Sequence, residues 1–167
     1  MERGQGCAPA AAGGCIIART IERAGRGPAR PCQGPLEPPG GDVIVGLGMD
    51  ISEVERLQAA MARHGRRFIE RVFTPAEIAY CDSHRNRAER YAGRFAAKEA
   101  AMKALGTGWS NGVRWVDIEV TRLPSGQPTL SLHGATREIA ERLGVRRASL
   151  SITHSGNTAL AQVIFES

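Results

Sequence analysis

Apolar residues in the first half of the folded region follow first a strand-like and then a helix-like spacing. The run Val43–Met49 is almost wholly apolar and predicts a buried strand that ends at Asp50. The spacing Ser52-x-x-Glu55 is that of a capping box, which predicts the start of a helix. The apolar face of that helix consists of Val54, Leu57 and Met61.

Two further helices follow in the pattern. Thr74-Pro75-x-Glu77 is a second capping box, and its proline takes the first helical position, where the missing N–H loses no hydrogen bond. The longest helical pattern extends from Ala88 to Leu105, and Gly106 is a natural C-terminal stop. The sequence therefore predicts one long helix near the middle of the domain.

The second half of the chain is dominated by strand patterns. Val116, Ile118 and Val120 alternate with polar residues, and Pro124-Ser125-Gly126 predicts a hairpin turn before a return strand over 129–132. A short helix ending at Gly144 is expected next, with its inward side chains at Ile139, Ala140 and Leu143. Two closing strands are expected over 148–153 and 158–165. The pattern indicates an α+β fold, with a mostly antiparallel sheet packed against one long helix and shorter helices.

Composition separates the first 42 residues from the rest of the chain. Residues 1–42 hold 9 of the 20 glycines and 6 of the 9 prolines, and they sustain no apolar periodicity. Such a segment cannot bury enough apolar surface to offset the entropy lost on ordering it. We therefore predict a disordered extension over 1–42, arising from a start codon assigned too far upstream, and a single domain over 43–167.

Charge and cysteine usage limit the classes of partner and compartment. The 22 Lys and Arg exceed the 17 Asp and Glu by five, which favours an anionic partner without identifying it. No CxxC pair is present, and three of the four cysteines fall within the first 32 residues, so a reducing cytoplasm is expected. No apolar run reaches the roughly 18 to 20 residues that a membrane-spanning helix needs.

The long helix and the first strand carry the candidates for chemistry. Glu99 and Lys103 are four residues apart and project from one side of the helix, with Phe95 one turn earlier. The pair is either a solvated surface ion pair or, given its alanine-rich surroundings, a pair of charges that need a ligand. Asp50 either opens the next helix through a turn or binds a ligand at a strand end. Together, Asp50 and Glu99 would suit a Mg²⁺ ion completed by phosphate oxygens.

Three more features leave alternatives open. The Gly106-Thr107-Gly108 turn would let a phosphate approach the backbone, although a plain helix stop explains it equally well. His154 ends an apolar strand as either a surface hydrogen-bonding group or a ligand-binding one. A basic face on the first helix is either a solvated surface or a dock for an acidic partner, and its residues are Arg56, Arg63, Arg66, Arg67 and Arg71. Sparse aromatic residues weaken the alternative of a small nucleic-acid-binding module without catalysis.

Taken together, these motifs resemble those of a known family. Gly48-Met49-Asp50 and Phe95-Ala96-Ala97-Lys98-Glu99-Ala100-x-x-Lys103-Ala104-x-Gly106 are similar to the two signature motifs of the holo-[acyl-carrier-protein] synthases, the small bacterial-type 4′-phosphopantetheinyl transferases. Ser151–Ser155 is similar to the family's third motif, and Gly126-x-Pro128 to its hairpin. The likeness covers the whole predicted domain and implies the 4′-phosphopantetheinyl transferase fold.

The resemblance implies a Mg²⁺-dependent reaction of fatty acid biosynthesis. Coenzyme A would donate its 4′-phosphopantetheine group to a serine of apo acyl carrier protein, with release of adenosine 3′,5′-bisphosphate. By likeness of motif, Asp50 and Glu99 would bind Mg²⁺, and Lys103 would neutralise the leaving phosphate. Glu99 would take the serine proton either directly or through a metal-ordered water. All three residues are therefore expected to be catalytic.

The resemblance also implies binding residues and an assembly. Coenzyme A would be bound by Arg94, Lys103, Gly106, Gly108 and His154. The acidic helix of the carrier protein would dock on Arg56, Arg67 and Arg71. Small members of the family form homotrimers with active sites between subunits, so different chains are expected to contribute to one site. Neither a membrane nor a nucleic acid is an expected partner.

Overall fold

The computed structural model describes residues 44–167, so the predicted extension over 1–42 lies outside the described residues. Within residues 44–167 the α-helices are α1 (Val54–Val72), α2 (Pro75–Asp82), α3 (Arg87–Ala104) and α4 (Gly134–Arg142). The strands are β1 (Gly46–Glu53), β2 (Ile118–Arg122), β3 (Pro128–Leu132), β4 (Arg147–Ser155) and β5 (Thr158–Glu166), and a short 3₁₀ helix, η1 (Trp115–Asp117), precedes β2. None of the described helices combines the length and the apolar character needed to span a membrane.

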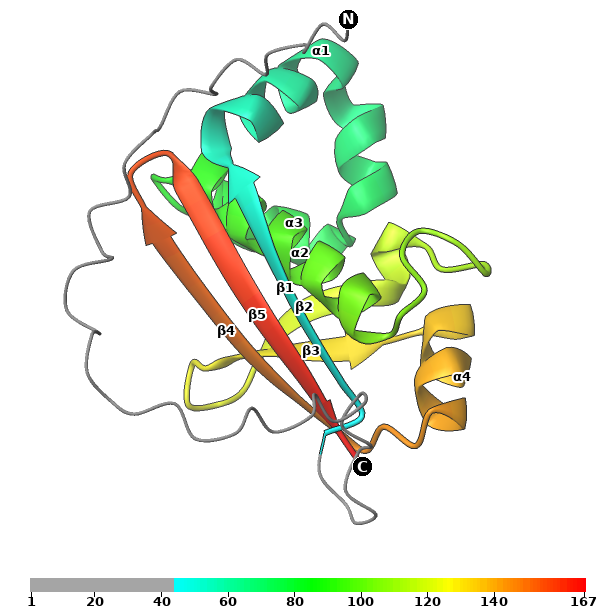
Figure 1. The fold of residues 1–167 in the computed structure, drawn as a ribbon. Helices are drawn as coiled ribbons and strands as arrows, with labels where there is room; N and C mark the ends of the chain where they lie inside the picture. Colours follow the sequence, from blue (N-terminus) through cyan, green and yellow to red (C-terminus); the bar gives the residue numbers. More distant parts are fainter. Residues whose placement is uncertain (1–43) are drawn as a thin grey trace, which may run out of the picture. The chain divides into compact units, whose positions relative to one another are not determined.

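The strands form two antiparallel sheets, which confirms the predicted fold class while dividing the sheet in two (Figure 1). The larger sheet has the order β1-β5-β4, and its register places Asp50 opposite Ala161 on β5. Alternate residues of β5 are completely buried because successive side chains point to opposite faces of a sheet. These buried residues are Ala159, Ala161, Val163 and Phe165.

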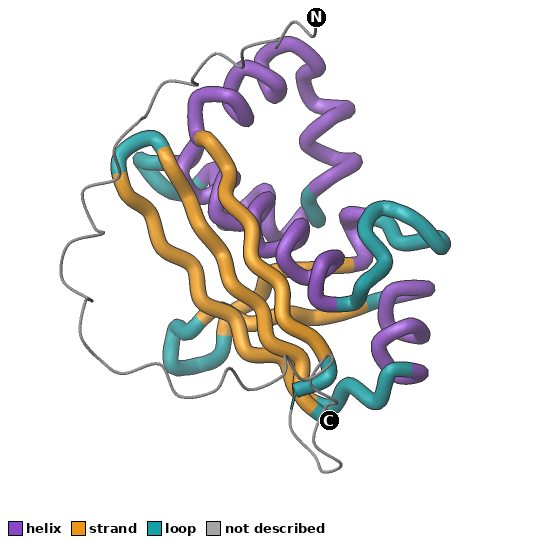
Figure 2. The backbone as a smooth tube through the Cα atoms, in the orientation of Figure 1, coloured by secondary structure: helices purple, strands orange, loops and turns teal. Residues whose placement is uncertain are grey.

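The buried face of this sheet packs against α3, the long helix that the sequence predicts (Figure 2). Gly46 and Gly48 allow β1 to approach α3 closely, because a Cβ on either would overlap the carbonyl oxygen of Ala104 or Ala100. The alanines of α3 are completely buried at Ala92, Ala96, Ala97, Ala100 and Ala101. Small residues on both elements thus bring the strand of Asp50 directly against the helix of Glu99.

The start of α1 differs from the prediction. β1 keeps pairing with β5 as far as Glu53, so Ser52 lies within the strand and the predicted capping box is wrong. The N-cap residue is Glu53, and its side chain makes no capping hydrogen bond. Instead, the main-chain oxygen of Asn157 accepts the N–H of Val54 at 2.8 Å, and its side-chain oxygen accepts the N–H of Glu55 at 3.0 Å. The first turn of α1 is therefore capped from the β4–β5 turn.

A bend divides α1 into two pieces at Gly65. Its φ of 62° and ψ of −152° form a combination that only glycine adopts without strain. On the predicted apolar face, Val54 and Leu57 are buried and Met61 is half-buried. The periodicity thus identifies the inward face of the helix but not its bend.

The capping box of α2 is confirmed. Thr74 Oγ1 accepts the N–H of Glu77 at 3.3 Å, and the Glu77 carboxylate accepts the N–H of Thr74 at 2.9 Å. The stop of α3 is also confirmed, because Gly106 has a φ of 69° and donates its N–H to the carbonyl of Lys103 at 3.0 Å. Both termini follow from local backbone chemistry, which neighbouring residues in the sequence reveal.

A buried ion pair joins α2, α3 and β2. The Nζ of Lys98 lies 2.8 Å from a carboxylate oxygen of Glu77, and both side chains are almost completely buried. Lys98 also donates to the carbonyls of Trp115 and Ile118 at 2.9 and 2.6 Å, while Glu77 accepts the N–H of Val120 at 3.0 Å. The pair thus provides hydrogen-bond partners for main-chain groups of η1 and of one edge of β2. Those on β2 would otherwise need a neighbouring strand.

Two smaller predictions in the second half are wrong. Val116 belongs to η1 and not to a strand, because β2 begins at Ile118. Leu143 is 46% exposed, since it is the C-cap residue beyond the last turn of α4 and not part of its inward face. Ile139 and Ala140 are buried as predicted, and the β2–β3 hairpin forms as predicted.

Candidate active site

A cavity of about 550 Å³ beside α3 contains all three residues that the sequence predicts to be catalytic. Asp50 reaches it from β1, and Glu99 and Lys103 reach it from α3. Further walls come from α1 and α3 through Arg56, Leu57, Ala60, Phe68 and Phe95. The structure thus brings together two carboxylates that are distant in the sequence.

Lys103 binds Asp50 directly. Its Nζ lies 2.8 Å from Asp50 Oδ1 and 3.0 Å from the carbonyl oxygen of Met49. The Lys103 side chain is 51% exposed and that of Asp50 is 17% exposed, so the ammonium group lies nearer the mouth of the cavity. Solvent screening limits the strength of such a pair, which leaves the ammonium able to turn toward an incoming phosphate.

Glu99 is half-buried and has an altered acidity. Burial raises the pKa of its carboxyl group, the nearby charge of Asp50 raises it further, and Lys103 acts in the opposite direction. A carboxylate with a raised pKa is a stronger base than an ordinary glutamate. The residue that the cavity places near Asp50 is therefore suited to accept a proton.

Replacing Glu99 with glutamine is expected to stabilise the fold at neutral pH. Because the pKa is raised on folding, the folded state holds the proton more tightly, and the ionised carboxylate lowers stability above the folded-state pKa. Below the ordinary value of 4.5 both states are protonated, so the advantage of the variant should disappear. Thermal melting of both proteins across this pH range measures the effect, and a variant that melts lower at neutral pH would contradict it.

The donor set determines which metal ion the cavity suits. No group of three or more His, Cys, Asp and Glu side chains with the geometry of a metal site lies within residues 44–167. Zinc and calcium sites in proteins usually draw on at least three protein ligands. Mg²⁺ is commonly held by only one or two carboxylates, with waters and substrate phosphates completing the shell. Asp50 and Glu99 in an open cavity fit that ion.

Two predicted coenzyme-binding residues lie in a different place. Arg94 and His154 line a cavity of about 170 Å³ together with Tyr80, Arg90 and Arg122. The guanidinium carbons of Arg94 and Arg122 lie 4.0 and 4.6 Å from the centroid of the Tyr80 ring. Five residues, or about 140° of helical rotation, separate Arg94 from Glu99 on α3. Within one chain, the two groups of predicted residues therefore face different directions.

This smaller cavity concentrates more positive charge than the sequence predicts. The Nε atoms of Arg90 and Arg94 and the hydroxyl of Tyr80 are buried without hydrogen-bond partners. Unpaired buried donors are costly, and a phosphate in the cavity would satisfy them. Sequence reasoning missed Tyr80, Arg90 and Arg122. Only Arg90 has a signal in the sequence, its one-turn spacing from Arg94, whereas Tyr80 and Arg122 lie on other elements.

The remaining predicted residues are dispersed. Gly106 and Gly108 both have positive φ, are exposed, and line neither cavity. Arg56 lines the 550 Å³ cavity, and Arg67 is exposed shortly after the bend in α1. Arg71 lies in the last turn of α1, away from both cavities. The docking arginines thus share one helix but not one cavity.

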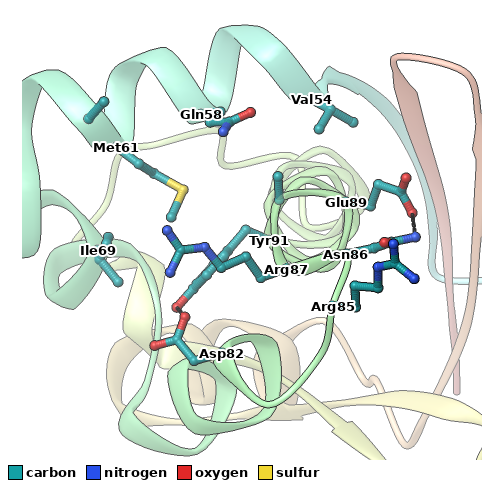
Figure 3. Close-up of a pocket in the computed structure, with 12 residues that line it drawn as sticks. Val54, Gln58, Met61, Ile69, Asp82, Arg85, Asn86, Arg87, Glu89 and Tyr91 are labelled. Atoms are coloured by element: carbon teal, nitrogen blue, oxygen red, sulfur yellow. Dashed lines mark hydrogen bonds between the residues drawn. The ribbon is translucent and has the colours of Figure 1, made fainter.

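A further cavity of about 530 Å³ also borders α1 but contains none of the predicted site residues. Figure 3 shows the hydroxyl of Tyr91 pointing toward Asp82, at 3.1 Å, and Arg87 reaching into the space. Arg85 and Glu89 complete a charged lining of two acidic and two basic side chains. This cavity is similar in volume to the one at Glu99, but its charges balance and no predicted residue enters it, so it is not the candidate site.

Comparisons with known proteins agree with the motifs. The family model of the 4′-phosphopantetheinyl transferase superfamily matches residues 46–161. A holo-[acyl-carrier-protein] synthase of Solibacter usitatus is 55% identical over 124 residues, which cover 74% of this chain and 99% of the relative. The crystal structure of the Neisseria meningitidis synthase has a TM-score of 0.69 and 33% identity, and covers 74% of this chain and 99% of that one. The Helicobacter pylori synthase in complex with coenzyme A has a TM-score of 0.64 and 30% identity, with coverage of 71% and 98%. With this family match, these identities and this shared fold, the chain belongs to the 4′-phosphopantetheinyl transferase superfamily.

Proposed function

We propose that this protein transfers 4′-phosphopantetheine from coenzyme A to a serine of apo acyl carrier protein. The observation that carries the proposal is the convergence of Asp50, Glu99 and Lys103 in one open cavity. The name of the Solibacter usitatus relative and the coenzyme A complex of the Helicobacter pylori relative support it. Service to fatty acid biosynthesis in the cytoplasm is part of the same proposal.

The reaction joins the serine oxygen to the phosphorus nearest pantetheine and breaks that phosphorus's bond to the bridging oxygen. Adenosine 3′,5′-bisphosphate leaves with that oxygen. Phosphoryl transfer of this kind depends mainly on positioning and on neutralisation of charge. Glu99 accepts the serine proton, and Lys103 turns from Asp50 to the leaving phosphate.

Asp50 and Glu99 are the residues that would hold Mg²⁺ in this cavity. The ion would supply Lewis-acid neutralisation of the diphosphate. Asp50 also keeps the Lys103 ammonium at the mouth of the cavity until a phosphate arrives. The two carboxylates thus have unequal tasks, since Glu99 also acts on the carrier serine.

We assign the phosphates at the adenosine end of the coenzyme to the cavity of Arg94 and His154. Its unpaired buried donors favour an anion, but it lies on another face of α3 from Glu99. A second copy of the chain that supplies one of the two cavities would join them into one site. This favours the homotrimer with active sites between subunits that the family resemblance implies.

An uncovered apolar surface on the larger sheet supports this self-association. Leu47, Met49 and Ile51 alternate along β1 on the face opposite α3 and are 55%, 51% and 57% exposed. Their ladder partners on β5 include Ile164 and Leu160. A contiguous exposed apolar surface of this kind marks a protein interface.

Combining two inactive variants is expected to restore activity. The composite site would combine the cavity of Arg94 from one chain with the cavity of Glu99 from another. Arg94→Ala damages the first cavity and Glu99→Gln damages the second. When both variants are co-expressed and assemble at random, about a quarter of the sites should contain two intact halves. The rate of holo carrier formation measures the recovery, with each variant expressed alone as the control. A mixture as inactive as the single variants would contradict a site shared between subunits.

The proposed reaction is tested by intact mass spectrometry of a carrier protein. The full chain is incubated with coenzyme A, Mg²⁺ and apo acyl carrier protein. The carrier should gain the mass of one 4′-phosphopantetheine group, and a carrier whose serine is replaced by alanine should gain nothing. An unmodified carrier together with salt-sensitive nucleic-acid binding would favour the alternative of a non-catalytic basic module.

A further inference from the structure

Trp109 is the most exposed large apolar side chain among the described residues, at 62%. It lies in the loop between α3 and η1, which is internally braced. The N–H groups of Thr107 and Gly108 both donate to the carbonyl of Met102 at 3.3 Å, and the hydroxyl of Ser110 donates to the carbonyl of Thr107. The fold therefore holds a large apolar ring outward, where a tryptophan without a partner loses the benefit of burial.

A cavity of about 300 Å³ opens beside this ring. Its other walls are Glu70 and Arg71 from α1, together with Arg114, Trp115 and Val116. The guanidinium carbon of Arg71 lies 5.5 Å from the centroid of the Trp109 ring. Arg114 is held by two hydrogen bonds to Asp117, of 2.7 and 3.0 Å, so its stem forms a fixed wall. Glu70 is bonded to Arg66 at 2.6 Å, so Arg71 is the charged lining residue without an ion-pair partner among the described residues. The space thus has aromatic walls and a rim whose unpaired charge is positive.

Trp115 connects this space to the proposed reaction cavity. Its ring stacks on Phe95, with centroids 4.8 Å apart and planes inclined by 21°. Phe95 lines the reaction cavity with Glu99 and Arg56. A protein that presents a serine to Glu99 is therefore a close neighbour of the cavity beside Trp109.

We infer that the 300 Å³ cavity anchors an apolar side chain of the acyl carrier protein, with Trp109 as the main source of affinity. The inference rests on the proposed function. Charge complementarity selects this occupant, because the rim contains Arg71 and α1 also presents Arg56 and Arg67. An acidic protein surface with an apolar side chain among its carboxylates matches both the rim and the walls. Tryptophan and arginine are also the residues that most often dominate binding energy at protein interfaces.

The test is a steady-state comparison of Trp109→Ala with the wild-type chain, using coenzyme A, Mg²⁺ and purified apo acyl carrier protein. The KM for the carrier should rise about 10- to 30-fold, while the KM for coenzyme A stays unchanged. Trp109→Phe should retain most of the affinity. The matched control is Leu143→Ala, which truncates an exposed apolar side chain outside all these cavities and should change neither KM.

The dependence on ionic strength distinguishes the apolar contact of Trp109 from the charged contact of Arg71. The fold-change caused by Trp109→Ala should persist at high ionic strength, because an apolar contact is not screened. The effect of Arg71→Ala should shrink under the same conditions. Apo carrier should also reduce acrylamide quenching of tryptophan fluorescence in the wild-type chain, and this protection should be lost in Trp109→Phe, which retains only Trp115.

Three results would overturn the inference. If the wild-type chain is active and Trp109→Ala leaves the KM for the carrier unchanged, Trp109 does not bind the carrier. The proposed function would still stand. An equal rise in the KM for coenzyme A would place Trp109 at the coenzyme instead. A wild-type chain that forms no holo carrier would overturn the proposed function and, with it, this inference.

Discussion

Replacing Glu99 with glutamine is expected to reduce the rate of carrier modification about 10²- to 10⁴-fold, the usual contribution of a general base. Glutamine keeps the size and the helix propensity of the side chain but cannot accept the serine proton or hold a cation. The loss should appear in kcat at saturating coenzyme A and carrier, measured by intact mass spectrometry of the carrier over time.

The matched control for this change is Glu138→Gln. Glu138 is an exposed residue of α4 and lines none of the cavities described above. Its rate should equal that of the wild-type chain. If Glu99→Gln retains more than about a tenth of the wild-type rate, Glu99 is not the general base.

Replacing Lys98 with methionine is expected to lower the free energy of unfolding by about 3 to 5 kcal/mol. The change leaves the Glu77 carboxylate buried without its cation and removes the Lys98 hydrogen bonds to the carbonyls of Trp115 and Ile118. Burial lowers the pKa of the Lys98 ammonium, and the nearby Glu77 carboxylate acts in the opposite direction. Urea unfolding followed by circular dichroism measures the loss.

Lys103→Met is the control on the same helix. It should change stability little but reduce the transfer rate. Lys103 is 51% exposed, and its removal should change stability by no more than about 1 kcal/mol. Transfer should nevertheless fall strongly, because the leaving phosphate loses its cation. If Lys98→Met unfolds at the wild-type urea concentration, the buried pair does not hold α2, α3 and β2 together.

Elements specified by neighbouring residues were predictable from the sequence. The capping box at Thr74 and the stop at Gly106 depend on hydrogen bonds within a single turn of helix. The two closing strands predicted over 148–153 and 158–165 are also present, as β4 and β5. Each of these signals is local and needs no knowledge of the tertiary structure.

Elements that depend on distant contacts were not predictable in this way. Ser52 has the spacing of a cap, but pairing with β5 keeps it in the strand, and Asn157 supplies the cap instead. Tertiary pairing outweighs a local propensity of about 1 kcal/mol in such cases.

The same distinction between local and distant contacts applies to the candidate site. The helical spacing of Glu99 and Lys103 places them on one side of α3, but only the close packing of β1 on α3 brings Asp50 to them. Arg94 and His154 lie in a separate cavity of the same chain, which no spacing reveals. The residues around them, Tyr80 and Arg122, come from other elements and belong to no motif.

The most direct measurement is an X-ray structure of the protein crystallised with coenzyme A and with Mn²⁺ in place of Mg²⁺. Anomalous scattering locates the manganese ion independently of how the protein is traced. We predict the peak between the carboxylates of Asp50 and Glu99, beside the diphosphate of the coenzyme. A coenzyme whose diphosphate and metal lie elsewhere, with neither carboxylate in contact, would contradict the assignment of this cavity as the reaction site.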